Sequence, residues 1–214
     1  VSASEGSIKV YTSQGTDVTA AFHISVAPGT LTIKKRQVTL ESAGDTKEYD
    51  GTALTNDKVT ISGDGFVDGE VSGIAATGTI TGVGSVDNSI SYTTTDHFNK
   101  NNYSISMKPG KLTITPNTST VTLTVNNVER VYDGTALTST AITSEGLPGE
   151  MTVSVTTDGT LTNVGAVDNN VTSYTILDSA GTDVTKYFSD VITVPGELTI
   201  TKRSVTLTSH GAEK

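Results

Sequence analysis

The sequence contains no cysteine and no tryptophan among its 214 residues. Without cysteine, the fold uses no disulfide and no thiolate metal site. Aromatic residues make up 5% of the chain and hydrophobic residues 34%, so any core must be thin and largely aliphatic. No stretch approaches the roughly 20 apolar residues that a membrane-spanning helix needs. We therefore expect no membrane insertion.

Motifs of known chemistry are also scarce. The sequence has no phosphate-binding loop, no dinucleotide fingerprint and no Gly-x-Ser-x-Gly nucleophile elbow. Its three histidines, His23, His97 and His210, have no partner at metal-binding spacing. The net charge of −9 repels nucleic acid rather than attracting it. We expect no nucleic-acid partner, no cofactor, no metal, no catalytic residue and no enzymatic activity.

What the sequence does have is a strand pattern. Threonine fills 40 positions, and segments such as Val-Thr-Leu at 38–40 and Leu-Thr-Ile at 112–114 alternate apolar with polar residues. Branched side chains and a period of two are typical of half-buried β-strands. We predict an all-β fold of tandem small domains in an elongated array, with an immunoglobulin-like sandwich favoured. A β-grasp-like sheet is the alternative, using short helical turns at 17–22 and 183–188.

Three sequence motifs recur in the same order, 81 to 86 residues apart. The Tyr-Asp-Gly motif, Tyr-Asp-Gly-Thr-Ala-Leu-Thr, lies at 49–55 and 132–138. The Gly-to-Asn motif, Gly-Thr-x-Thr-x-Val-Gly-x-Val-Asp-Asn, lies at 78–88 and 159–169. The Pro-Gly motif, Pro-Gly-x-Leu-Thr-Ile, lies at 28–33, 109–114 and 195–200. A period of this length indicates a repeated small domain.

The motifs divide the chain into a partial repeat (1–34), two full units (35–116 and 117–201) and the start of a next unit (202–214). The last assignment follows because Lys-Arg-Ser-Val-Thr-Leu at 202–207 resembles Lys-Arg-Gln-Val-Thr-Leu at 35–40. We expect the partial repeat to be packed and a strand to run unbroken from 31 to 40. Junctions without glycine predict a semi-rigid rod.

Repetition favours structural roles for the motif residues. Tyr49 and Tyr132 are expected to pack within their own units, each followed by an Asp-Gly turn. Asp87-Asn88 and Asp168-Asn169 are expected to form Asx-type turns, with calcium binding between units as the alternative. The loop Gly63–Glu70 carries three carboxylates and is the best calcium candidate. Because its counterpart in the second unit lacks both aspartates, we favour a solvated hairpin.

Together, the three motifs resemble the MBG/YDG family of bacterial extracellular repeats. This resemblance implies tandem structural or adhesion-associated domains of cell-wall-anchored or secreted surface proteins and adhesins, without catalytic residues. The Asn-Tyr that usually precedes the closing strand stands at Asn102-Tyr103, but Tyr187-Phe188 and Ala21-Phe22 replace it in the other copies. The retained ring is therefore expected to belong to the core.

We therefore expect a non-enzymatic stalk, or spacer, on a bacterial cell surface, whose partners are neighbouring repeat units. The alternative is an adhesive or carbohydrate-binding module that binds a host or cell-wall glycan or protein. Sugars commonly stack on exposed rings, and the absence of tryptophan weighs against it. A Lys–Asn isopeptide cross-link is a further alternative, for which Lys35 and Lys202 are the candidate lysines.

Overall fold

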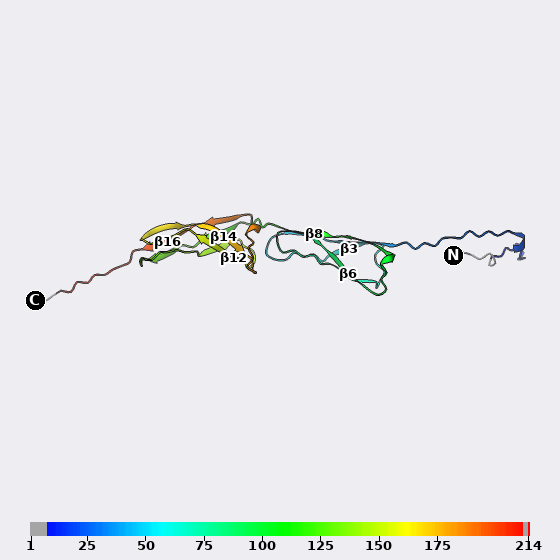
Figure 1. The fold of residues 1–214 in the computed structure, drawn as a ribbon, viewed down its shortest axis with the longest axis horizontal. Helices are drawn as coiled ribbons and strands as arrows, with labels where there is room; N and C mark the ends of the chain where they lie inside the picture. Colours follow the sequence, from blue (N-terminus) through cyan, green and yellow to red (C-terminus); the bar gives the residue numbers. More distant parts are fainter. Residues whose placement is uncertain (1–7, 212–213) are drawn as a thin grey trace.

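The computed structural model describes residues 8–211 and 214, and these residues are nearly all β. Two sets of strands follow one another along the long axis of the molecule (Figure 1). We call them the first unit (36–115) and the second unit (121–201). Three short 3-10 turns interrupt the described residues: η2 (Thr19–Ala21), η3 (Lys100–Asn102) and η4 (Thr185–Tyr187). The first and third lie inside the predicted helical turns at 17–22 and 183–188.

Each unit contains eight strands. Those of the first unit are β1 (Arg36–Ser42), β2 (Asp45–Glu48), β3 (Val59–Gly63), β4 (Val71–Ala76), β5 (Gly84–Asn88), β6 (Ile90–Thr94), β7 (Tyr103–Lys108) and β8 (Gly110–Thr115). Those of the second are β9 (Val121–Val125), β10 (Val128–Val131), β11 (Ile142–Glu145), β12 (Thr152–Thr157), β13 (Gly165–Asn169), β14 (Val171–Leu177), β15 (Val191–Val194) and β16 (Gly196–Thr201).

The two units have the same topology. In the first, the strand orders are β3-β1-β7, β2-β8-β5 and β4-β6; in the second they are β11-β9-β15, β10-β16-β13 and β12-β14. In each unit, the first strand pairs in parallel with the strand that follows the 3-10 turn of that unit. These pairs are β1 with β7 and β9 with β15. The next pairs, β2 with β8 and β10 with β16, are parallel as well. The recurring motifs therefore accompany a recurring strand arrangement.

Each unit has a waist where its long strands break and pass from one sheet to another. Ala43 and Gly44 separate β1 from β2, and Pro109 separates β7 from β8. Proline cannot donate a ladder hydrogen bond, so the break falls naturally at this residue. The backbones meet closely there, because a Cβ atom on Gly110 would lie 2.5 Å from the amide nitrogen of Gly44. The glycine of the Pro-Gly motif thus permits the crossing.

We expect Gly110→Ala to destabilise the first unit by about 1–3 kcal/mol, because the added methyl group must displace backbone. Gly196→Ala should act alike, since its Cβ would lie 2.5 Å from the carbonyl oxygen of Val125. The matched control is Gly29→Ala in the partial repeat, where no atom lies within 4 Å. Urea unfolding of the three variants tests this, and equal stability of all three would contradict it.

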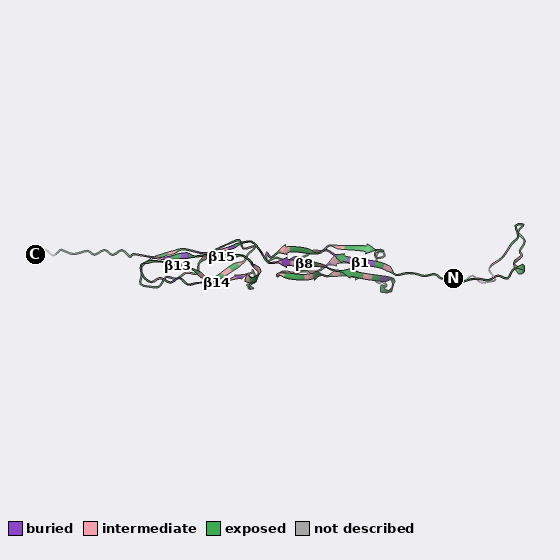
Figure 2. Ribbon diagram, turned by 90° about the horizontal axis from the view of Figure 1, so that it is seen from above, coloured by how far each residue is buried: buried purple, intermediate pink, exposed green. Residues whose placement is uncertain are grey.

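Three hydrophobic clusters lie along the molecule, and buried residues recur along both units (Figure 2). One cluster occupies the outer half of the first unit around Val38, Leu40 and Tyr103. Another occupies the far half of the second unit around Leu137, Leu198 and Ile200. The middle cluster contains buried residues of both units: Tyr49, Leu54, Leu112, Ile114, Val121, Leu123, Ile176, Val184 and Phe188. The two units therefore share one core.

The partial repeat is expected to be packed, but its described residues, 8–34, contribute no side chain to the three hydrophobic clusters of this chain. Its residues 8–22 form a local loop closed by a bridge between Tyr11 and Asp17, but Leu31 and Ile33 are 79% and 99% exposed. The predicted unbroken strand from 31 to 40 is wrong, because β1 begins at Arg36. The physical reason is missing partners. The corresponding strand β8 lies between β2 and β5, and the partial repeat has no described strands in those places.

Candidate functional site

The boundary between the units is organised around Tyr49. This residue directly follows Glu48, the last residue of β2. Its ring centroid lies 4.8 Å from that of Tyr187 and 5.9 Å from that of Phe188, the latter edge to face. Both partners belong to the second unit, at the end of η4. Aromatic pairs at such distances contribute about 0.5–1.5 kcal/mol beyond the apolar area they bury. Tyr49 is only 2% exposed.

The same motif behaves differently in the second unit. Tyr132, the counterpart of Tyr49, is 39% exposed. The prediction that each motif tyrosine packs within its own unit is therefore wrong. The unit alone leaves the ring partly exposed at its end, and the following unit buries it. This dependence on a neighbour was missed because the sequence period shows that a residue recurs, but not which unit supplies its contacts.

The turn after each tyrosine matches its prediction. The Asp50 Oδ1 atom accepts hydrogen bonds from the Thr52 backbone amide at 2.8 Å and from its hydroxyl at 2.7 Å, while Gly51 adopts φ +81°. Asp133 and Thr135 repeat these bonds at 2.9 and 2.8 Å. Such Asx turns with glycine in the left-handed region favour a tight reversal. The turn presents the preceding tyrosine at the end of the unit.

A lysine supports the first turn. The Lys47 Nζ atom lies 2.7 Å from the Asp50 carboxylate and 2.6 Å from the Thr52 hydroxyl oxygen. This hydrogen bond, together with those from Thr52, lowers the pKa of Asp50 to about 2 from its ordinary 3.8. Because a depressed pKa means that folding favours the carboxylate, Asp50 stabilises the fold above about pH 4 and loses this effect as pH falls toward 2.

We predict that Asp50→Asn removes part of the acid-induced loss of stability between about pH 4 and pH 2. The amide keeps an acceptor for Thr52 but carries no titrating charge. Since the Asp50 side chain is 44% exposed, the effect should stay below about 1 kcal/mol. Urea unfolding from pH 2 to pH 5 measures it. Lys47→Met removes the main cause of the lowered Asp50 pKa and should reduce the pH dependence of the unfolding free energy over the same range. If this pH dependence were unchanged in both variants, Asp50 would not be its source.

The linker between the units is held by Asn117. Its Nδ2 atom donates to the Tyr49 carbonyl at 2.8 Å, and its backbone amide donates to the Tyr187 carbonyl at 2.8 Å. Its own carbonyl accepts from the Ser189 amide at 3.1 Å. Asn117 is 8% exposed, so these bonds are shielded from water. One residue thereby ties the end of the first unit to the η4 region of the second.

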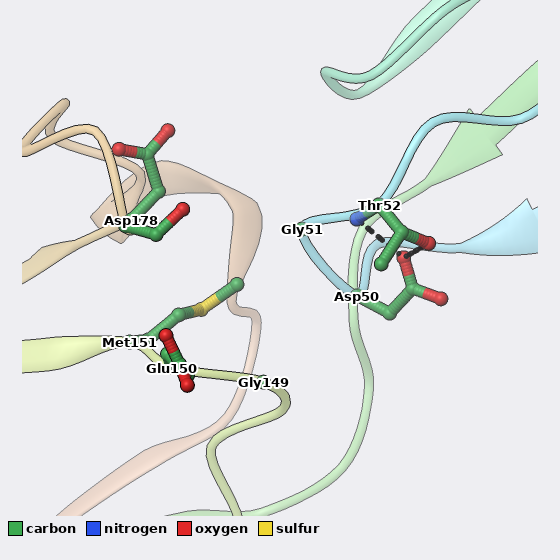
Figure 3. Close-up of a pocket in the computed structure, with 8 residues that line it drawn as sticks. Asp50, Gly51, Thr52, Gly149, Glu150, Met151 and Asp178 are labelled. Atoms are coloured by element: carbon green, nitrogen blue, oxygen red, sulfur yellow. Dashed lines mark hydrogen bonds between the residues drawn. The ribbon is translucent and has the colours of Figure 1, made fainter.

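An open groove runs beside this contact (Figure 3). On one side lie Asp50, Gly51 and Thr52, and on the other the segment 149–151 and Asp178. The Met151 side chain extends toward Gly51, where a Cβ atom would lie 2.9 Å from its Cε atom. Although the groove carries acidic side chains, the described residues contain no group of three acidic or histidine side chains placed to hold a metal ion.

The acidic loop Gly63–Glu70 forms the connection between β3 and β4, and two of its carboxylates serve the fold. The Asp64 Oδ2 atom accepts from the Gln37 amide at 2.8 Å. Glu70 accepts a hydrogen bond from the Tyr103 hydroxyl, and this hydroxyl accepts from the Val67 amide at 3.0 Å. Burial, followed by the bond to Glu70, raises the pKa of Tyr103. These contacts hold the segment as a loop between two sheets, because β3 pairs with β1 and β4 pairs with β6. The predicted hairpin is therefore wrong.

The prediction that Asp-Asn pairs form Asx turns is wrong for Asn88 and Asn169, both fully buried. The Asn88 Oδ1 atom accepts from the Gly78 amide at 3.0 Å, and its Nδ2 atom donates to the carbonyls of Ala43 and Asn56 at 2.8 and 2.7 Å. Asn169 likewise accepts from Gly159 at 2.9 Å. The first and last residues of the Gly-to-Asn motif are thus bonded to each other. Asn88 also bonds to the distant Ala43 and Asn56, and sequence reasoning missed these pairings.

The remaining candidates lie on the surface. His23, His97 and His210 are exposed, as are Lys35 and Lys202. An isopeptide link needs its lysine in a shared core, and these two lysines do not meet that condition. The Asn88 amide group already donates to two carbonyl oxygens. Within the part of the chain that the structure describes, these histidines and lysines therefore do not form a reactive cluster.

Comparisons with family models, with curated proteins and with solved structures find no match to this chain. No helix among the described residues is long and apolar enough to cross a membrane. The junction between the units, with its shared core, is accordingly the feature from which function is best argued.

Proposed function

We propose that this chain is a structural spacer, a piece of a stalk built from tandem β-domains. The observation that carries the proposal is the middle cluster, in which buried residues of both units form one core across the junction. A shared core resists bending, because rotating one unit against the other would expose Tyr49, Tyr187 and Phe188 to water. The bonds of Asn117 add a polar restraint to the same linker.

The proposed setting is the outside of a bacterial cell, where the stalk would hold another part of its protein away from the surface. The resemblance of the three motifs to the MBG/YDG repeats supports this setting. The end-to-end arrangement of the units in Figure 1 suits a spacer, since every added unit lengthens the molecule.

Within the all-β class, we propose the β-grasp-like alternative for each unit rather than the immunoglobulin-like sandwich. A sandwich of that kind is built from antiparallel sheets. Here β1 pairs with β7 in parallel and β2 pairs with β8 in parallel. The turn η4 lies within the segment 183–188 that this alternative uses, and η3 directly precedes β7 in the first unit.

Electron–electron distance measurements test the rigidity of the junction. Spin labels at Asp57→Cys and Thr162→Cys, two exposed positions in different units, are specific because the chain has no native cysteine. We expect a narrow distance distribution. Four glycine or serine residues inserted between Asn117 and Thr118 should broaden it, and an equally broad distribution without the insertion would contradict the spacer proposal.

The adhesive alternative is tested separately by a glycan array probed with the same chain. A spacer should give no glycan-specific signal. Specific binding that survives Tyr49→Ala but is lost in Tyr132→Ala would instead support an adhesive module that uses the exposed ring.

A further inference from the structure

The far end of the second unit repeats the surface that the junction buries on the first. We define its end face by Tyr132, Val164 and Val167, which are 39%, 47% and 37% exposed. Their counterparts in the first unit are Tyr49, Val83 and Val86. Tyr49 is buried in the middle cluster and the two valines are partly buried against it. Equivalent apolar positions thus differ in exposure according to whether a unit follows.

The glycine of the Asp-Gly turn shows the same contrast. Gly51 and Gly134 have nearly the same backbone conformation, with φ +81° and +83°. A Cβ atom on Gly51 would meet the Met151 side chain of the following unit at 2.9 Å, whereas Gly134 has no atom within 4 Å of that position. The turn of the second unit is therefore shaped for a neighbour in the same way as the turn of the first.

The segment that leaves this end face carries the pattern of a first strand. In β1, Val38 and Leu40 are 1% and 0% exposed, and Val121 and Leu123 in β9 are both fully buried. The matching Val205 and Leu207 are 77% and 93% exposed. These two side chains alternate along the chain as those of the buried strands do, so the segment has the side chains for a strand but no sheet around it.

We propose that the end face of the second unit is a docking surface for a further repeat unit of this kind, whose first strand is Lys202–Leu207. The ring of that unit at the position of Phe188, which the first unit keeps as Tyr103, would lie over Tyr132 as Phe188 lies over Tyr49. The inference rests on the proposed spacer function and names the partner through which the array is extended.

The new junction differs from the existing one in a way that sharpens the test. Five residues, 116–120, separate Thr115 from Val121, but only three separate Thr201 from Val205. The shorter linker has no counterpart of Asn117. Val131 also replaces Glu48, which accepts a hydrogen bond from the linker residue Thr118 at 2.8 Å. Docking there depends on apolar contact with Tyr132 more than on polar restraints.

The test uses the chain through Leu207 followed by a copy of residues 124–201. Nitration of tyrosines with tetranitromethane, read by peptide mass spectrometry, reports ring exposure. We expect Tyr132 to react at least tenfold more slowly in the extended chain than in the original, approaching Tyr49 in the same sample. A matched variant with Tyr187→Ala and Phe188→Ala in the added copy should restore the fast reaction of Tyr132.

Amide exchange of the added copy shows whether it has folded. A second extended chain carries a copy of residues 38–116 after Ser204. It keeps the test valid if the added copy of residues 124–201 does not fold. A folded copy beside a Tyr132 that reacts as fast as before overturns the inference, and so does failure of both copies to fold. Fast nitration of Tyr49 in the original chain would instead contradict the shared core and hence the spacer function itself.

Discussion

Replacing Tyr49 with alanine is expected to lower the free energy of unfolding by about 3–5 kcal/mol, the usual cost of removing a large buried ring. The side chain is 2% exposed and packs on Tyr187 and Phe188. A small domain is stable by only about 5–15 kcal/mol. Because the lost contacts belong to both units, the variant should also unfold in two separate transitions rather than one.

The repeat itself supplies the control. Tyr132→Ala changes the same motif position in the second unit, where the ring is 39% exposed, and should cost about 1 kcal/mol or less. Calorimetry, or urea unfolding monitored by amide exchange, compares the stability losses of Tyr49→Ala and Tyr132→Ala. Equal losses from the two substitutions would show that the tyrosine stabilises its own unit and that the junction contributes little.

The second large effect is expected at Asn88. Alanine there leaves the carbonyls of Ala43 and Asn56 and the amide of Gly78 without their side-chain partner. A buried polar group that loses its partner costs about 1–3 kcal/mol, so we expect a total loss of about 3–4 kcal/mol. Because these groups come from three segments of the waist, amide exchange should speed up in β1, β2 and β5 together.

Asn88→Asp separates hydrogen bonding from packing, because the two side chains have nearly the same shape. The carboxylate can still accept from Gly78 but faces two carbonyl oxygens instead of donating to them. The variant should therefore be less stable at pH 7 than at pH 4, where a protonated carboxyl can donate one bond. Asn170→Ala, at an exposed site next to Asn169 in the second unit, should cost less than about 1 kcal/mol. An equally mild loss at Asn88 would contradict its role as a buried cross-link.

Local features of the fold were predictable from particular residues. Alternation in Val-Thr-Leu and Leu-Thr-Ile predicts strands β1 and β8, and the Asp50-Gly51 pair predicts the observed turn. These predictions succeed because alternation and turn chemistry act over a few residues. The role of Asn88 was not predictable in this way. Its partners Ala43 and Asn56 lie 45 and 32 residues away in the sequence.

The sequence by itself determined that the chain is an all-β protein with a repeated unit, because strand periodicity and recurrence are written in the order of side chains. Only the tertiary structure decided what the repeated tyrosine does. Tyr49 and Tyr132 stand in the same motif, yet one is buried and the other is not. The difference arises because burial depends on which surfaces meet in space, and the surface that covers Tyr49 comes from residues 187 and 188 of the next unit.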